Sequence, residues 1–304
     1  MIASGIDDLI GDTPLIKLQK LSLESGVNIL AKCEFLNPTS SIKDRTALWM
    51  INGAIKRGEI DKNSTLIEPT SGNTGVALAS ICASKGIKLI LTMPESMSIE
   101  RRKLFTFLGA SIVLTPASEG MSGAIKKAKE LVDNLNGFML SQFDNEDNAL
   151  AHLESTAIEI LMATHSKIDA FVSAVGTGGT ISGTGKGLKQ TIPHIKIVAV
   201  EPTESSVLSG NKPSPHGIQG IGAGFIPKIL NQNIYDEIIT VNTNEAINMA
   251  SRVAKEEGLL IGISAGANLV ASMELAKRMN KGETIVTILC DTAQRYLSTA
   301  LFDE

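Results

Sequence analysis

The 304-residue sequence lacks the features that mark metal-binding, disulfide-rich, membrane-spanning and secreted proteins. It contains only three cysteines, Cys33, Cys82 and Cys290, which lie far apart in apolar surroundings without C-x-x-C spacing. This distribution predicts neither a metal site nor a disulfide framework, and it favours a reducing, cytoplasmic location. No apolar run reaches the ~20 residues of a membrane-spanning helix. The N-terminus, with Asp7 and Asp8 beside a short apolar stretch, does not have the pattern of a signal peptide.

The chain also has no excess of positive over negative charge. The formal net charge is -4 and the pI is near 5.7, so the basic excess of a nucleic-acid-binding protein is missing. No fixed-period repeat and no low-complexity linker interrupts the chain. With 43% apolar and 20% charged residues, the sequence predicts a globular protein with an ample core, in one large or two medium domains.

Short apolar runs alternate with helical patterns along the whole chain. The runs that predict strands are 28–34, 65–68, 88–92, 111–115, 138–142, 168–175, 195–200, 237–241 and 284–289. Nearly all are rich in Val, Ile and Leu without polar alternation, as expected for strands that helices cover on both faces. The alternation predicts an α/β protein with mostly parallel sheets. A polar cluster at 143–148 suggests a domain boundary.

The segment 37–45 places Lys43 at the start of a predicted helix. Ser40 or Ser41 can cap this helix, and apolar residues recur at helical spacing over 47–55. The helix dipole disfavours a cation in the first turn, which suits a lysine that must lose its proton to form a Schiff base or to act as a base. The alternative is an ordinary solvated lysine.

A second polar stretch, 68–75, lies between a predicted strand and an apolar helix. Thr70, Ser71, Asn73 and Thr74 offer hydroxyls, an amide and backbone N–H groups around a glycine-loosened helix start, which suits a carboxylate ligand. A hydroxyl-rich helix cap without a ligand is the alternative. Four polar side chains are more than one cap requires.

Two further stretches of small residues open predicted helices. The stretch 176–180 follows a buried-type strand, as in loops that hold a phosphate on backbone amides. The G-x-G-x-x-G and Walker A nucleotide patterns both fail there, so a phosphate outside a nucleotide is the better interpretation, with a tight strand-to-helix turn as the alternative. In the stretch 261–267, Ser264 taken alone indicates only a helix cap.

A reactive lysine, a phosphate loop and a carboxylate site together point to pyridoxal 5′-phosphate acting on an amino acid. The sequence also resembles the cysteine synthase (O-acetylserine sulfhydrylase) family of tryptophan-synthase-β-like, fold-type-II enzymes, from residue 10 to residue 299. The motifs that carry the resemblance are Ser41-Ile42-Lys43-Asp44-Arg45, Thr70-Ser71-Gly72-Asn73-Thr74-Gly75, Gly176-Thr177-Gly178-Gly179-Thr180, Gln219-Gly220-Ile221-Gly222-Ala223-Gly224-Phe225-Ile226-Pro227 and Gly262-Ile263-Ser264-Ala265-Gly266.

The resemblance implies two three-layer α/β domains with mostly parallel sheets. A smaller mobile domain, 41–145, would carry the substrate-carboxylate loop, and a larger domain, 1–40 plus 146–304, would carry the phosphate loop. The activity implied is a β-replacement in which O-acetyl-L-serine loses acetate to give an α-aminoacrylate, to which sulfide or thiosulfate then adds. The product with sulfide is L-cysteine.

The resemblance also assigns site residues. Lys43 would form the internal aldimine and move the Cα proton. Asn73 would contact the 3′-oxygen of the cofactor, and Ser264 would face its pyridine nitrogen. A serine cannot keep that nitrogen protonated as an aspartate would, so β-elimination is favoured over transamination. The remaining roles implied are phosphate binding by Gly176, Thr177, Gly178, Gly179 and Thr180, and substrate-carboxylate binding by Thr70, Ser71, Thr74 and Gln142.

The family features are mixed. Cys290-Asp291 matches B-type members, whereas the segment 219–227 matches A-type members, so the sulfur donor stays open. Cystathionine β-synthase is the alternative, although it usually carries Tyr-Asp where this chain has Ala223-Gly224. The resemblance further suggests small-molecule substrates, a homodimer, and binding of a serine acetyltransferase C-terminal tail.

Overall fold

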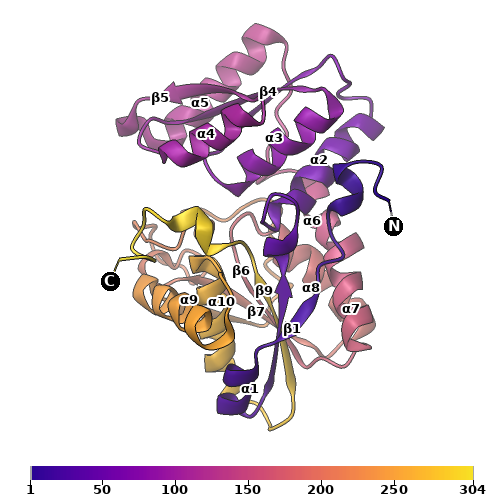
Figure 1. Cartoon of the computed structure of the whole chain (residues 1–304), viewed down its shortest axis with the longest axis vertical. Coiled ribbons are helices and arrows are strands. Elements are labelled where there is room, and N and C mark those ends of the chain that lie inside the picture. Colours follow the sequence, from indigo (N-terminus) through magenta and orange to yellow (C-terminus); the bar gives the residue numbers. More distant parts are fainter. Residues whose placement is uncertain (1, 304) are drawn as a thin grey trace. The chain divides into compact units, whose positions relative to one another are not determined.

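The computed structural model describes residues 2–303 of the chain, and Figure 1 labels its helices and strands. The strands are β1 (Leu15–Lys17), β2 (Asn28–Cys33), β3 (Thr65–Pro69), β4 (Lys88–Pro94), β5 (Ser111–Thr115), β6 (Ala170–Ala174), β7 (Lys196–Pro202), β8 (Glu237–Val241) and β9 (Thr284–Leu289). The α-helices are α1 (Gln19–Ser25), α2 (Lys43–Lys56), α3 (Asn73–Lys85), α4 (Ile99–Phe107), α5 (Gly120–Leu135), α6 (Glu146–Ala151), α7 (Ala157–Thr164), α8 (Gly179–Thr191), α9 (Thr243–Glu257) and α10 (Ile263–Ala276). A π-helix, His152–Thr156, joins α6 to α7.

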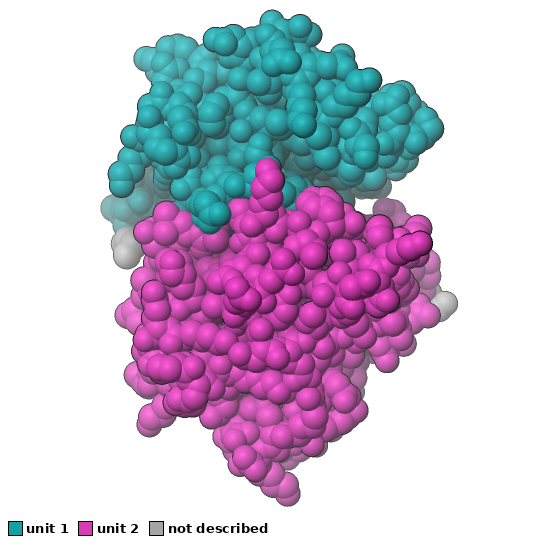
Figure 2. All heavy atoms as spheres, turned by 180° about the vertical axis from the view of Figure 1, so that it is seen from behind, with its two compact units in different colours: residues 1–10, 43–148 teal, residues 11–42, 149–304 magenta. Residues whose placement is uncertain are grey.

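The chain divides into two compact units, coloured separately in Figure 2. Unit 1 comprises Met1–Ile10 and Lys43–Asn148, and unit 2 comprises Gly11–Ile42 and Ala149–Glu304. The segment up to Ile10 groups with unit 1, whereas the expected division assigned all of 1–40 to the larger domain. Two contacts account for this grouping, because Asp7 pairs with Lys85 at 2.6 Å and Ile10 packs against the core of unit 1. The expected mobility of the smaller domain stays a prediction.

Unit 1 is built on a three-stranded parallel sheet in the order β3-β4-β5. Its core joins this sheet to α2 and α3 and contains, for example, Ile51, Leu78 and Leu91, all of which are almost fully buried. The helix α5 packs against all three strands. Because every strand runs the same way, the loops after β3, β4 and β5 all lie at one edge of the sheet.

Unit 2 is built on a six-stranded sheet in the order β1-β2-β9-β6-β7-β8. All neighbouring pairs are parallel except β1 with β2. The inner strands β6, β7 and β9 are buried and apolar, and α8 and α10 both pack against β6 and β7. These features confirm the predicted α/β class with mostly parallel sheets. Among residues 2–303, no helix is both long and apolar enough to cross a membrane.

Two details of the sequence-based strand prediction differ from the structure. The run 138–142 is not a strand, because only Phe138 forms a bridge, to Leu66, before the backbone turns left-handed at Ser141 with φ 58°. The strand β1 was not predicted, since three residues after a proline give too short a pattern to read. The other eight predicted runs correspond to strands, with boundaries shifted by a few residues at most.

Candidate functional site

Lys43 is the first residue of α2, as the sequence predicted. The two residues before it belong to unit 2 and are anchored just beyond β9, where Ser41 bridges Asp291 and the N–H of Ile42 donates to the carbonyl of Cys290 at 2.9 Å. Ser40 has a left-handed backbone, φ 60°. The segment of unit 2 that precedes α2 is therefore held by backbone contacts.

The predicted carboxylate loop lies in unit 1, between β3 and α3. The N–H of Thr70 donates to the carbonyl of Thr92 at 3.1 Å, which holds the loop at the carboxyl ends of β3 and β4. Ligands of open α/β sheets bind at this edge. Asn73 is the first residue of α3 and Gly72 its N-cap, so no cap side chain competes for the first N–H groups of the helix. This loop is suited to an anion.

Thr74 and Gln142 are brought together within unit 1. The Thr74 hydroxyl donates to Oε1 of Gln142 at 2.7 Å, and both side chains are buried. With its oxygen engaged by Thr74, the Gln142 amide has its NH₂ group left as the donor for a ligand. The carbonyl of Gln142 accepts from Nδ2 of Asn148 at 2.8 Å, and Thr46 in α2 donates to Oδ1 of Asn148 at 3.2 Å. A buried polar chain thus links the helix of Lys43 to the carboxylate loop.

The predicted phosphate loop lies in unit 2, between β6 and α8. Gly178 is the N-cap of α8 and is left-handed, φ 88°, and a Cβ there would lie 2.8 Å from Cβ of Leu230. A Cβ on Gly176 would clash with the carbonyl oxygen of Gly220. Both positions therefore require glycine, for conformation at Gly178 and for space at Gly176. The loop presents the N-terminus of a 13-residue helix, which is a good phosphate site.

Thr180, in the first turn of α8, contacts a buried histidine that the sequence analysis did not single out. Nε2 of His152 lies 3.3 Å from the Thr180 hydroxyl, and Nδ1 lies 2.9 Å from the hydroxyl of Thr156. His152 opens the π-helix, a distortion that often occurs at functional sites. The glycine at position 183 allows this approach, because a Cβ there would clash with the carbonyl of Ala149. A single histidine in an apolar run gives no signal in the sequence that it contacts the phosphate loop.

Ser264 lies in the first turn of α10, also in unit 2, and is 4% exposed. One turn later, Asn268 fixes this helix to the sheet: its Oδ1 accepts from the N–H of Ala174 at 2.7 Å, and its Nδ2 donates to the carbonyl of Ile288 at 2.8 Å. These bonds lie where β6 and β9 separate. The hydroxyl of Ser264 is therefore held at the same sheet edge as the phosphate loop.

The helix starts in these segments differ from others in the chain. The helices α3, α8 and α10 all have glycine at the N-cap. In contrast, α9 begins with a capping box between Asn242 and Glu245, and Ser98 caps α4. Capping side chains satisfy the first N–H groups of a helix, so glycine leaves them for another acceptor. The N-cap residues of α1, α5 and α7 likewise make no side-chain cap bond, so glycine at the N-cap, and not the missing cap alone, is what the three ligand-assigned segments share.

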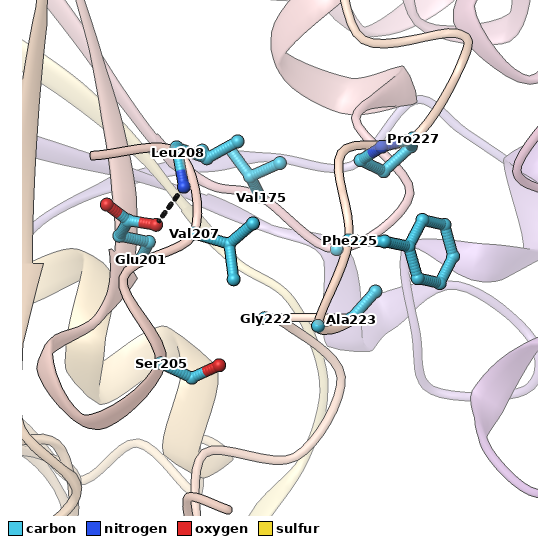
Figure 3. A pocket seen from close by; sticks show the side chains of 11 residues that line it. Val175, Glu201, Ser205, Val207, Leu208, Gly222, Ala223, Phe225 and Pro227 are labelled. Carbon is cyan, nitrogen blue, oxygen red and sulfur yellow. Dashed lines mark hydrogen bonds between the residues drawn. The ribbon is translucent and has the colours of Figure 1, made fainter. Parts of the chain in front are cut away.

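A small pocket lies beside the phosphate loop (Figure 3). Val175 and Gly176 form one part of its wall, and Ala223 and Gly224 form another. Its empty space is about 260 Å³, including the part open to solvent. Glu201 also lines it, but its carboxylate accepts from the N–H groups of the loop 208–209 at 2.8 and 3.0 Å. The charge of Glu201 is therefore used to hold that loop.

Two of the three cysteines, Cys33 and Cys82, are poor candidates for a nucleophile. Burial raises the pKa of Cys33 to about 11 and that of Cys82 to about 12. Both thiols are thus protonated at neutral pH, and a protonated thiol is a weak nucleophile. Amine chemistry at Lys43 remains the better interpretation.

Comparison with known proteins decides the family. A family model described as "Pyridoxal-phosphate dependent enzyme" matches residues 6–291. The cysteine synthase of Staphylococcus aureus is 51% identical, over 98% of this chain and 96% of that protein. The chain belongs to the cysteine synthase family of pyridoxal-phosphate dependent enzymes. Another member, cysteine synthase B of Campylobacter jejuni, is 52% identical over 98% of both chains. A crystal structure of cysteine synthase from Entamoeba histolytica is similar with a TM-score of 0.97 and 43% identity, covering 100% of this chain and 93% of that one.

The family's cofactor, pyridoxal 5′-phosphate, fits the residues present. The loop 176–178 leads into the N-terminus of α8, which has no side-chain cap, so the first N–H groups of that helix suit a phosphate. Lys43, the first residue of α2, would supply the amine that this cofactor needs, and Ser264 would supply a neutral hydroxyl at a buried helix start. Each group that the cofactor requires therefore has a candidate in the chain.

Proposed function

We infer that this chain is a cysteine synthase that converts O-acetyl-L-serine and sulfide into L-cysteine and acetate. The observation that carries the inference is the hydrogen-bonded pair Thr74 and Gln142 beside the uncapped start of α3, in a chain whose Lys43 begins α2. A loop of this kind is suited to an amino-acid carboxylate. A lysine at a helix start is suited to remove a proton from the α-carbon of that amino acid. The high identity to cysteine synthases supports the same conclusion.

The residues divide the work as follows. Lys43 would hold the cofactor through its amine, and the same amine would remove the Cα proton of the substrate and return one. When bound, pyridoxal phosphate would supply the electron sink for this chemistry. Asn73 would bind the 3′-oxygen of the cofactor, and Gly176 to Thr180 would bind its phosphate. The substrate carboxylate would be held by Thr70, Ser71, Thr74 and Gln142.

Ser264 sets the type of reaction. Its neutral hydroxyl would face the pyridine nitrogen of the cofactor and would not hold a proton there. The negative charge at Cα is then only moderately stabilised, which favours expulsion of the β-acetoxy group over transamination. The buried position of Ser264 and its firm anchoring through Asn268 support this role.

The sulfur donor is sulfide, with thiosulfate as a second candidate. Cys290-Asp291 is the B-type feature that favours thiosulfate, and 52% identity to a cysteine synthase B agrees with it. The segment 219–227 is A-type. Ala223-Gly224, which lines the pocket beside the phosphate loop, distinguishes the chain from cystathionine β-synthases, which usually carry Tyr-Asp there.

A spectroscopic experiment on the holoenzyme tests the function. O-Acetylserine alone should release one acetate per active site and cause a persistent change in the visible absorbance of the holoenzyme. Sulfide, thiosulfate and homocysteine are then added separately. Rapid return of the spectrum with sulfide and formation of cysteine support the proposal. A preference for homocysteine, with serine as the better first substrate, would make the enzyme a cystathionine synthase, and no spectral change with either O-acetylserine or serine would remove both activities.

The role of Lys43 has its own test. Borohydride reduction of the holoenzyme followed by peptide mapping should place the mass of the cofactor on Lys43. The control site is Lys32, which is buried and paired with Glu159 and Thr13. A label on Lys32 or on any other lysine would contradict the assignment.

The remaining proposals concern assembly and location. The enzyme forms a homodimer, as the family resemblance suggests, and light scattering of the purified protein tests this. It works in the cytoplasm, in agreement with its three widely spaced cysteines. The C-terminal tail of a serine acetyltransferase binds at the carboxylate loop, because a peptide carboxylate has the same chemistry as the substrate's. A synthetic tail peptide should then compete with O-acetylserine, and its amidated form should not.

A further inference from the structure

Gln142 follows a backbone turn that is held by one buried carboxylate. Glu68, in β3, is 2% exposed, and its two oxygens accept separate N–H groups: Oε2 from Ser141 at 3.0 Å and Oε1 from Gln142 at 3.1 Å. Ser141 is left-handed, φ 58°, which is uncommon for a residue other than glycine. A left-handed residue turns successive N–H groups toward one side, forming a concave site for an anion. Here the carboxyl group of Glu68 occupies that site.

The carbonyl side of the turn has its own supports. The carbonyl of Ser141 accepts from the N–H groups of Asp144 and Asn145 at 2.8 and 3.0 Å, and that of Gln142 accepts from Nδ2 of Asn148 at 2.8 Å. A left-handed non-glycine residue persists where its surroundings compensate the cost. On the N–H side of residues 141 and 142, the two hydrogen bonds to Glu68 contribute to that compensation. They also fix the direction in which the Gln142 side chain leaves the backbone toward Thr74.

We propose that Glu68 is a positioning residue of the substrate-carboxylate site, which holds the turn at Ser141 and thereby aims the Gln142 amide at the substrate. This inference rests on the proposed role of Thr74 and Gln142 as carboxylate ligands. Glu68 does not touch the substrate. Its effect reaches the site through the backbone N–H groups of residues 141 and 142.

The first test is Glu68→Gln. Glutamine keeps the size of the side chain but replaces one acceptor oxygen with an NH₂ group that cannot accept, so one of the two N–H groups loses its partner. We expect the KM for O-acetylserine to rise about tenfold, the typical effect of leaving one buried donor unsatisfied. The kcat should change less than threefold, and the cofactor content should stay the same. A fall in kcat with unchanged KM would overturn the proposal.

A binding measurement separates this inference from the proposed function. L-Alanine has the amine and carboxylate of the substrate but no leaving group, so its titration through the visible absorbance of the holoenzyme reports capture alone. Glu68→Gln should weaken L-alanine binding by about the same factor as it raises the KM. Equal affinity in variant and wild type would contradict the proposal. Wild-type binding of L-alanine without any cysteine formation would remove the proposed function and leave the role of Glu68 in place.

The matched control is Glu257→Gln. The Glu257 carboxylate likewise accepts backbone N–H groups, those of Gln19 and Lys20 at the start of α1. It belongs to unit 2 and has no bond to the carboxylate loop. This variant should leave both the KM and the L-alanine affinity unchanged. An equal effect of Glu257→Gln would mean that the loss seen with Glu68→Gln reflects general destabilisation.

A rescue variant tests whether Glu68 affects the carboxylate site through the backbone turn at Ser141. Glycine adopts the left-handed conformation without strain, so Ser141→Gly should restore part of the substrate affinity in the Glu68→Gln background. The two changes should therefore be non-additive in a double-mutant cycle. Strict additivity would show that Glu68 acts by another route.

Amide hydrogen exchange provides a test on the wild type that needs no variant to fold. The N–H groups of Ser141 and Gln142 should be protected before any ligand is added, because Glu68 already binds them. L-Alanine should then leave their exchange rates unchanged. Protection that arises only on addition of L-alanine would mean that the substrate orders the turn, which would overturn the proposal.

Discussion

Thr74 and Gln142 lie 68 positions apart in the sequence and are joined by a 2.7 Å hydrogen bond from the threonine hydroxyl to the glutamine amide oxygen. Because the bond fixes which end of the amide faces outward, it determines whether Gln142 meets an anion with a donor or with an acceptor. The pair thus sets the polarity of the carboxylate site.

We expect Thr74→Val to weaken capture of O-acetylserine about tenfold, because the freed Gln142 amide can rotate and the hydroxyl itself is lost. Thr74→Ser keeps the hydroxyl and should stay within about threefold of the wild type. The measurements are KM and the L-alanine titration, with cofactor absorbance as a check on loading. Loss of the cofactor in Thr74→Val would show that the loop is structural.

Gly176→Ala should lower the affinity for pyridoxal phosphate by at least tenfold. The added Cβ would clash with the carbonyl of Gly220, so either the phosphate loop or the segment 219–227 has to move. Gly5→Ala is the matched control, since a Cβ there meets nothing within 4 Å. Reconstitution of the apoenzyme, followed by its visible absorbance, measures the effect. Normal loading of Gly176→Ala would mean that the loop has room to adapt.

Ser264→Asp should keep the cofactor but slow acetate release at least tenfold, since a carboxylate would hold a proton on the pyridine nitrogen and stabilise the carbanion too well. Ser264→Ala is neutral and should retain elimination within a few-fold. Stopped-flow measurement of the first half-reaction with O-acetylserine distinguishes the two variants. Equal rates in both would show that Ser264 does not face this nitrogen.

The free energy of unfolding should depend on pH through the titration of Glu68. Burial raises the pKa of Glu68 to about 7, although the N–H donors of the turn at 140–142 act to lower it. The unfolded chain loses this proton near pH 4.5, its ordinary value, whereas the folded chain keeps it to about pH 7. Between these values the folded state binds more protons, so the contribution of Glu68 to the free energy of unfolding falls as pH rises.

Urea unfolding of the wild type and of Glu68→Gln between pH 4 and pH 8 tests this linkage. Because all other groups are shared, the stability of the wild type relative to the variant should fall by about 3 kcal/mol from below pH 4.5 to above pH 7. A difference that does not vary with pH would show that Glu68 titrates normally.

The sequence predicted those features that depend on neighbouring residues. Eight strands, the start of α2 at Lys43 and the glycine-opened α8 follow from local apolar patterns and turn chemistry. Contacts between distant segments could not be read in this way. The bond of Glu68 to Ser141 spans 73 positions, and that of His152 to Thr180 spans 28. The run 138–142 was misassigned because its apolar residues fit a strand, whereas the buried carboxylate of Glu68 bends it into a turn.

The division of the chain also bears on how it folds during synthesis. All of unit 1 has been made by Asn148, so its parallel sheet can form while the remaining residues are still being added. In unit 2, β2 is made early but pairs with β9, the last strand of the chain. Its edge at 28–33 therefore waits for more than 250 residues of further synthesis before it is covered. An unpaired apolar strand is prone to aggregate. During translation the edge of β2 is thus open to wrong pairing until β9 has been made.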